Sequence, residues 1–430
     1  MPRTTPSPPR ASSSAPSDWS SPLMHLTTAD RGALLRGRIA VCLLFLLSGM
    51  AIGTWTARIP SIKQALELSD GRLSIGLLGI AAGAIAGMQA VGRLVDRHGS
   101  VKVMLPMAFA QSVVLILPAY MPNLVTLAIS LFAFGVVHGT LDVAMNANAV
   151  EVEQAMGRPV MSSFHAVFSI GGFLGAAVGG LLAHASLTPA TTFTVTAVVI
   201  AVLALCASRW AFTPVREPVQ EAAAGTAAGR SRGLMFLGVL GICCMIGEGA
   251  AADWSSVYLR DDLGSSAGFA AAAYAAFSIM MTAGRLAGDR LTARLGPVAL
   301  VRGCGLLAAS GFGLALLIGH PVAAVIGFGC FGAGLSCIVP QVFSAAGRRD
   351  PARAGQALAR VASLSYVGFL SGPVLIGSVA ELVGLPRALA IPVMLAAFVA
   401  LTASALHTRP LQRRSSNAEG ATRGHWANRS

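Results

Sequence analysis

The chain has 430 residues, of which 54% are hydrophobic and 11% are charged, and its mean hydropathy is +0.69. Soluble domains carry about 25% charged residues, so this composition argues against a soluble enzyme and indicates a membrane protein. The net charge of +13 does not indicate a nucleic-acid partner, because the basic residues lie mostly at the ends of apolar segments and in the two tails. The seven cysteines lie in apolar segments without CxxC or Cys/His spacing, so neither a metal site nor a disulfide is predicted.

Residues 1–37 are rich in Pro, Ser, Thr and Arg and are expected to form a disordered cytoplasmic tail. The apolar pattern that follows predicts an all-α membrane protein with twelve spans, two six-helix bundles at 38–209 and 233–406, and a cytoplasmic linker at 210–232. Residues 407–430 are expected to form a second disordered tail. The predicted spans are approximately 39–57, 73–92, 103–120, 124–148, 160–183, 188–208, 233–256, 267–286, 297–318, 322–345, 356–380 and 387–406.

The distribution of basic residues predicts the orientation. With the N-terminus inside, all but five of the 31 lysine and arginine residues fall on the cytoplasmic side. The five exceptions are Arg58, Lys63, Arg72, Arg260 and Arg387. We therefore expect a multi-pass protein of the plasma or inner membrane, with both termini in the cytoplasm.

The two halves repeat one another at offsets of 192 to 199 residues. Gly92 to Gly99 recurs as Gly284 to Arg290, Phe134-Gly135 as Phe331-Gly332, Gly172 to Gly175 as Gly368 to Ser371, and Trp55 as Trp254. Four matches in the same order predict a duplicated six-span unit, so that the two bundles are pseudo-symmetric. Transporters built from parallel repeats bind their solute between the halves and rock around it.

The loop after the second span carries Gly92-x-x-x-Asp96-Arg97-x-Gly99-x-x-Lys102, which resembles the signature of the major facilitator superfamily. A degenerate copy with Asp289 and Arg290 follows the eighth span. The resemblance covers about residues 38 to 407 and implies a conformational latch at the cytoplasmic side, built from Gly92, Asp96, Arg97, Gly99, Asp289 and Arg290. An aspartate there can also face a helix N-terminus and pair with arginine. The alternative is a solvated turn whose arginines only set the topology.

The fourth span places His138, Asp142 and Asn146 on one helical face, because they are spaced by four residues. Lipid cannot solvate this stripe, so it is expected to face the bundle interior or a water-filled cavity. A polar zipper between two helices is the alternative. The segment Thr140 to Asn146 also resembles the fourth span of the fucose permease branch of sugar–proton symporters, with Asp142 in place of the usual Glu.

The fifth span carries His165, at the position where that branch usually has Asn or Gln. Counting from Val150 and Arg158, Asp142 and His165 lie roughly 12 Å and 10 Å into the membrane, so we expect them to meet as a proton site. A structural hydrogen bond is the alternative. The same span ends in Gly175 to Gly180, which matches the glycines but not the proline of the drug–proton antiporter signature.

The second half adds Glu248 in the seventh span, predicted roughly 22 Å from the cytoplasm, and so in the outer third of the span, and facing the cavity. Trp254 and Trp55 either line the outer mouth or belong to the interfacial aromatic belt. Arg360 either snorkels to the cytoplasm or faces the cavity. Further candidates for lining the cavity are Gln89, Gln341 and Tyr366.

These features predict a secondary transporter of a small polar solute that works by alternating access. The resemblance implies a sugar as the solute. Asp142, His165 and Glu248 are the expected proton-coupling groups, and import is favoured over export. Proton-driven efflux and a non-transporting membrane sensor are the alternatives. The expected partners are the solute, protons and the lipid bilayer; the protein is expected to be a monomer and to have no cofactor, metal or catalytic residue.

Overall fold

The computed structural model describes residues 28–213 and 227–407, which fold as helices joined by loops, without any strand. The predicted tails at 1–27 and 408–430 and the linker at 214–226 lie outside the described residues. The first half contains α1 (Thr28–Ala65), α2 (Asp70–His98), α3 (Ser100–Ile116), α4 (Leu124–Met156), α5 (Met161–His184) and α6 (Pro189–Trp210). The second half contains α7 (Ala227–Val257), α8 (Ala267–Ile318), α9 (Pro321–Leu335), α10 (Ile338–Arg349), α11 (Ala354–Val383), α12 (Leu385–Ala388) and α13 (Ala390–Thr402).

Eleven apolar helical segments in the described residues are long enough to cross a membrane. One of them, Gly268–Ile318, has 51 residues, which is about 77 Å of helix against a hydrocarbon core of about 30 Å. Gly296 interrupts it with φ 75° and ψ 160°, and Pro297 follows. This segment is therefore two spans, and the predicted all-α fold with twelve spans is confirmed.

Several helix ends lie beyond the predicted boundaries. Helix α1 begins at Thr28, so residues 28–37 are not part of a disordered tail. Leu34 lies in these extra helical turns and is buried, and burial of its apolar side chain favours the helical extension. Helix α7 begins at Ala227, inside the predicted linker, and α4 continues to Met156, where Gly157 ends it with φ 59°. Hydropathy locates the part of a helix inside lipid and does not report how far the helix continues beyond it.

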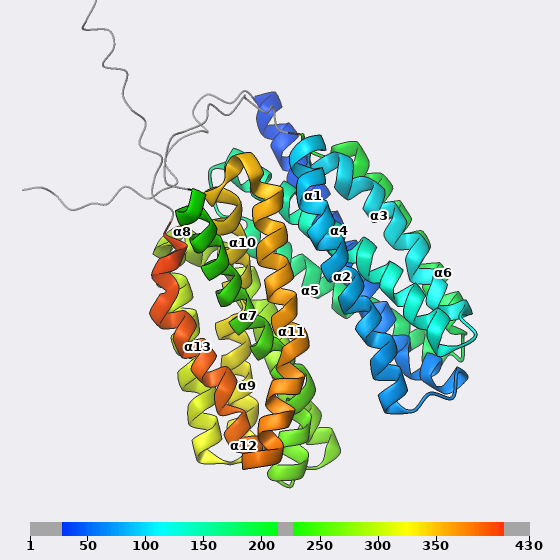
Figure 1. The fold of residues 1–430 in the computed structure, drawn as a ribbon, viewed down its shortest axis with the longest axis vertical. Helices are drawn as coiled ribbons and strands as arrows, with labels where there is room; N and C mark the ends of the chain where they lie inside the picture. The colour runs from blue at the N-terminus through cyan, green and yellow to red at the C-terminus, as the bar shows by residue number, and fades with distance from the viewer. Residues whose placement is uncertain (1–27, 214–226, 408–430) are drawn as a thin grey trace, which may run out of the picture.

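The helices form two groups that lie side by side, from blue to green and from green to red in Figure 1. Helix α1 packs on α5 and α6, and its counterpart α7 packs on α11 and α13. Small residues allow this packing: a Cβ on Gly53 of α1 would lie 2.0 Å from the carbonyl oxygen of Gly172 on α5. The groups meet where α2 contacts α11 and where α5 contacts α8.

Candidate functional site

The end of α2 is bound to the start of α11 through Asp96. Its carboxylate accepts hydrogen bonds from the backbone N–H of Gly355 (2.8 Å) and Gln356 (3.2 Å), and from the Gln356 side-chain amide (2.9 Å). The first N–H groups of a helix have no partner within it and carry partial positive charge, so a carboxylate stabilises them. Asp96 therefore joins the first half of the chain to the second.

The repeated motif makes the reciprocal contact. Asp289 of α8 accepts from the backbone N–H of Ser162 at 2.9 Å and from that of Ser163 at 3.2 Å, at the start of α5. Gly288 allows the approach, because a Cβ there would lie 2.6 Å from the Ser162 Cβ. Each half thus supplies an aspartate to a helix start of the other half. Gly99 forms the turn between α2 and α3 with φ 93°, and Arg97 and Arg290 are exposed at the same helix ends.

Glu153 makes a third contact between the two halves at the same end of the bundle. It was not among the predicted site residues. Its buried carboxylate accepts from the N–H groups of Val160 and Met161, both at 3.1 Å. It also accepts from the Ser344 hydroxyl of α10, and Arg348 lies 3.8 Å from it. These contacts hold α4 and α5 of the first half against α10 of the second.

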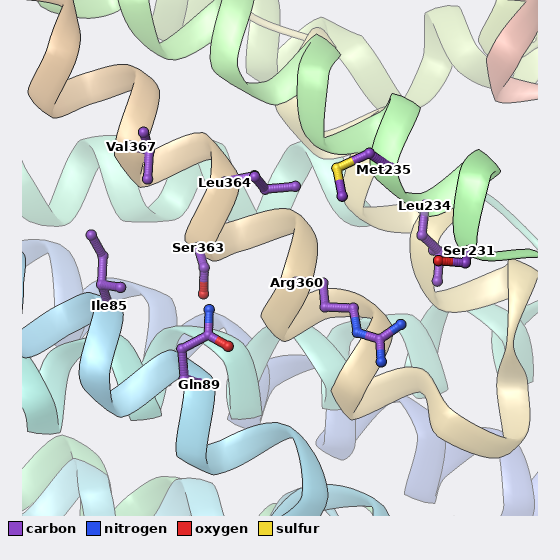
Figure 2. A pocket seen from close by; sticks show the side chains of 9 residues that line it. All are labelled: Ile85, Gln89, Ser231, Leu234, Met235, Arg360, Ser363, Leu364 and Val367. Atoms are coloured by element: carbon purple, nitrogen blue, oxygen red, sulfur yellow. The ribbon is translucent and has the colours of Figure 1, made fainter.

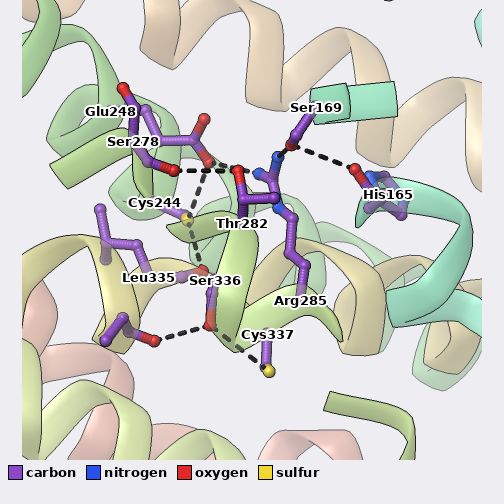
Figure 3. Close-up of polar contacts among 11 residues, drawn as sticks. His165, Ser169, Cys244, Glu248, Ser278, Thr282, Arg285, Leu335, Ser336 and Cys337 are labelled. Carbon is purple, nitrogen blue, oxygen red and sulfur yellow. Dashed lines mark hydrogen bonds and ion pairs between the residues drawn. The ribbon is translucent and has the colours of Figure 1, made fainter. Parts of the chain in front are cut away.

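Farther into the bundle, Arg285 of α8 bridges the two halves (Figure 3). Its Nη1 donates to the Ser169 hydroxyl of α5 at 2.7 Å, and its Nη2 lies 3.4 Å from Glu248 Oε1 of α7. The Arg285 side chain is 9% exposed and the Glu248 side chain is 22% exposed. Cys244 donates to the same carboxylate at 3.8 Å. A charge pair in an apolar interior is expensive to bury and typically marks a solute or ion pathway.

The depth of Glu248 corrects the prediction. It lies near the middle of the apolar segment Ser231–Asp262 rather than in its outer third, because that segment runs beyond both predicted ends. Arg285 lies inside the eighth span, 18 residues after Ala267 and 11 residues before the interruption at Gly296. In the sequence, Arg285 was noticed only as part of the repeated motif Gly284 to Arg290. An arginine this far inside an apolar segment is itself the signal that could have identified it.

The polar stripe of α4 is present. The Asn146 side-chain amide donates to the Asp142 backbone oxygen (2.9 Å) and to its carboxylate (3.1 Å). His138 is 4% exposed, and its ring stacks on Phe134 with centroids 5.9 Å apart. Tyr366 of α11 lies within electrostatic range of Asp142, and α4 contacts α11 of the second half.

The expected pairing of Asp142 with His165 does not form. Asp142 lies 14 residues, about 21 Å, from the end of α4 at Met156, whereas His165 lies four residues, about 6 Å, from the start of α5 at Met161. The short 157–160 connection places both helix ends at the same face, so the two side chains differ in depth. The His165 ring instead contacts Phe45 and Phe343, and its Nε2 has no hydrogen-bond partner among the described residues.

The remaining candidates divide between packing and surface positions. Trp55 is 3% exposed and packs against Phe193 of α6, so it belongs to the core of the first half. Gln341 is buried and donates to Thr292 at 2.9 Å within the second half. Trp254 is half-buried beside Gly377 of α11, and its Nε1 lacks a partner among the described residues. Gln89 is exposed and lines a lateral groove. Within the described ranges no group of three or more His, Cys, Asp or Glu side chains could hold a metal ion.

The comparisons with known proteins decide the family. The family model of the Major Facilitator Superfamily matches residues 39–356. The chain belongs to this superfamily. Among similar proteins, an uncharacterised MFS-type transporter of Yersinia pestis is 36% identical over 370 residues, covering 86% of this chain and 95% of the relative. The membrane protein MosC of Rhizobium meliloti is 32% identical over 360 residues, covering 81% and 85%.

Solved superfamily structures share the fold. The transporter FucP in the outward conformation matches with a TM-score of 0.73 at 16% sequence identity, covering 86% of this chain and 98% of FucP. The human organic anion transporter MFSD10 matches with a TM-score of 0.66 at 18% identity, covering 87% and 99%. The resemblance to the fucose permease branch is thereby confirmed at the level of the fold. By its family and its architecture, this protein is a multi-pass membrane transporter.

Proposed function

We propose that this protein is a proton-coupled secondary transporter of a small polar solute and works as a monomer by alternating access. The observation that carries the proposal is the bridge from Ser169 through Arg285 to Glu248, which links the two halves near the middle of their spans. A solute that binds between the halves can compete for these groups. Binding there would then alter the contacts that hold the halves together.

The contacts of Asp96, Asp289 and Glu153 support an assignment of the conformational state. All three join the two halves at the end that the positive-inside pattern assigns to the cytoplasm. The state with this end closed corresponds to an outward-facing transporter. The likeness to FucP in its outward conformation supports the same assignment.

Proton coupling is assigned to carboxylates inside the spans. The side-chain hydrogen bond of Asp142 comes from a neutral partner, Asn146, whereas Glu248 pairs with Arg285, which also binds Ser169. The surroundings of a carboxylate inside a span change when the halves move, so we assign to these two groups the uptake of a proton in one state and its release in the other. His165 is too near the cytoplasmic end of α5 to act with Asp142 and is more suitable for packing against Phe45 and Phe343.

We favour import of a hydroxyl-rich solute such as a sugar, because a solved structure of similar fold is a fucose:proton symporter. The buried arginine also suits an anionic solute, and the likeness to an organic anion transporter supports this second candidate. Proton-driven efflux uses the same groups with the opposite direction of solute movement. The solute class and the direction of transport therefore require separate measurements.

The first experiment is a thermal-shift screen of the purified protein against sugars, polyols, organic acids and cationic drugs, because a ligand that binds the folded state raises its unfolding temperature. The second measures uptake of the identified solute into proteoliposomes. An inward proton gradient should drive accumulation and a protonophore should abolish it. Uptake that requires sodium and ignores pH would exclude the proposed coupling, and exclusion of solute under the inward gradient would indicate efflux.

A further inference from the structure

A groove of about 400 Å³ lies on the side of the molecule between α2 of the first half and α7 and α11 of the second (Figure 2). It is separate from the Arg285 bridge, which lies between α5, α7 and α8. Its polar lining comes from three helices and includes Gln89, Ser231, Arg360 and Ser363. Figure 2 shows the Gln89 amide and the Ser363 hydroxyl facing one another, while Arg360, about one turn earlier on α11, extends its guanidinium away from them.

The groove lies in the membrane leaflet next to the Asp96 contact. Arg360 is six residues, about 9 Å, from the start of α11, and Ser231 begins the apolar segment of α7. The apolar lining is exposed to the side: Met235 is 56% exposed and Val367 is 46% exposed. The groove thus presents a polar floor near headgroup depth and apolar walls along which an acyl chain can lie.

The charge of the groove selects its ligand. Arg360 is exposed, and among the described residues no carboxylate lies within ion-pair distance of it. Arg93, one helical turn from Gln89 towards the end of α2, is exposed and adds a second positive charge nearby. Basic pockets between spans at the cytoplasmic side suit acidic lipid headgroups, and this leaflet carries the anionic lipids.

We propose that this groove binds an anionic phospholipid of the cytoplasmic leaflet and that the bound lipid favours the state closed to the cytoplasm. The proposal uses the orientation assigned above and does not depend on the identity of the solute. The physical reason for the second part is the position of the groove. Gln356, which bonds to Asp96, lies one turn before Arg360, so separation of α2 from α11 would break that contact and divide the groove.

The test uses the purified full chain and native mass spectrometry with phosphatidylglycerol and phosphatidylcholine as probes. Arg360→Gln should weaken retention of phosphatidylglycerol about fivefold, which corresponds to about 1 kcal/mol for one basic residue at the membrane surface. Arg360→Lys keeps the charge and should retain most of the lipid. The matched control is Arg302→Gln, since Arg302 is exposed on α8 and does not line the groove.

Three results would overturn lipid binding at this site: equal retention of both lipids, an equal effect of the Arg302 control, or displacement of the lipid by millimolar inorganic phosphate. The effect on conformation is read by hydrogen–deuterium exchange in lipid nanodiscs. Peptides covering 92–99 and 354–360 should exchange more slowly with phosphatidylglycerol than with phosphatidylcholine, and Arg360→Gln should remove the difference. Unchanged exchange despite bound lipid would refute the stabilising role.

Discussion

Replacing Asp96 by Asn tests whether the contact with the start of α11 controls the conformational balance. The aspartate accepts three hydrogen bonds from α11 across the boundary between the halves. Hydrogen bonds to a charged group contribute about 1.5–3 kcal/mol, against about 0.5–1.5 kcal/mol for neutral pairs. Asn keeps one acceptor oxygen but loses the charge and presents an NH₂ group to backbone donors.

We therefore expect the closed state to lose about 1–3 kcal/mol relative to the open state, a shift of about 5–150-fold in the equilibrium. Hydrogen–deuterium exchange measures this directly, because the N–H groups of Gly355 and Gln356 are protected only while Asp96 accepts from them. Their exchange in lipid nanodiscs should accelerate by a factor in that range if exchange occurs through the open state.

Two comparisons make the result specific. Asp289→Asn should accelerate exchange at Ser162 and Ser163 in the same way, because the two contacts are reciprocal. The control is Asp261→Asn, a carboxylate that is 65% exposed beyond the other end of α7 and should have no effect. Solute affinity should remain within a few-fold in both latch variants. Unchanged exchange at 354–360, or complete loss of solute binding with normal exchange, would refute the latch assignment.

Three further predictions concern the site and the packing around it. Asp142→Asn preserves the shape of the side chain and the contact with Asn146 but cannot titrate. Gradient-driven accumulation of the solute should therefore vanish while counterflow persists. Normal accumulation would move the proton-carrier role to Glu248. Arg285→Gln leaves Glu248 without its counter-charge, so it should abolish transport and lower the free energy of unfolding by about 1–3 kcal/mol at this partly exposed pair. Adding Glu248→Gln should restore stability but not transport. A single variant that is both stable and active would contradict this prediction. Gly92→Ala places a Cβ 2.9 Å from the Gln356 Cα and should accelerate hydrogen–deuterium exchange at the start of α11. The control Gly303→Ala, whose Cβ would have no atom within 4 Å, should not. Equal exchange in both variants would argue against close packing at Gly92.

The sequence motif placed Asp96 near the end of α2 and Asp289 near the end of the eighth span, but it could not name their partners. The motif shows that a carboxylate stands at the end of α2, whereas the N–H groups that it binds belong to residues about 260 positions later. Backbone donors carry no signature in the side-chain sequence. The same limit explains why Glu153 was missed: its partners are two backbone N–H groups and a serine from the other half.

Depth was the other source of error. The estimate for Asp142 and His165 assumed that α4 ends near Val150, where hydropathy falls, but the helix continues to Met156. Six residues change the depth by about 9 Å, more than the reach of a hydrogen bond. The stripe of His138, Asp142 and Asn146 was predicted reliably, since spacing by four residues is a property of the helix itself.

The sequence by itself determined the class of this protein, its twelve spans, the internal repeat and the superfamily, because each follows from local composition or from a short motif repeated along the chain. The tertiary structure decided which charged groups meet. Arg285 reaches Ser169 and Glu248 only because α5, α7 and α8 approach one another there, and Asp142 comes within electrostatic range of Tyr366 only because α4 contacts α11. Burial of an ion pair depends on how separate helices pack, and the order of residues along one helix does not specify its neighbours.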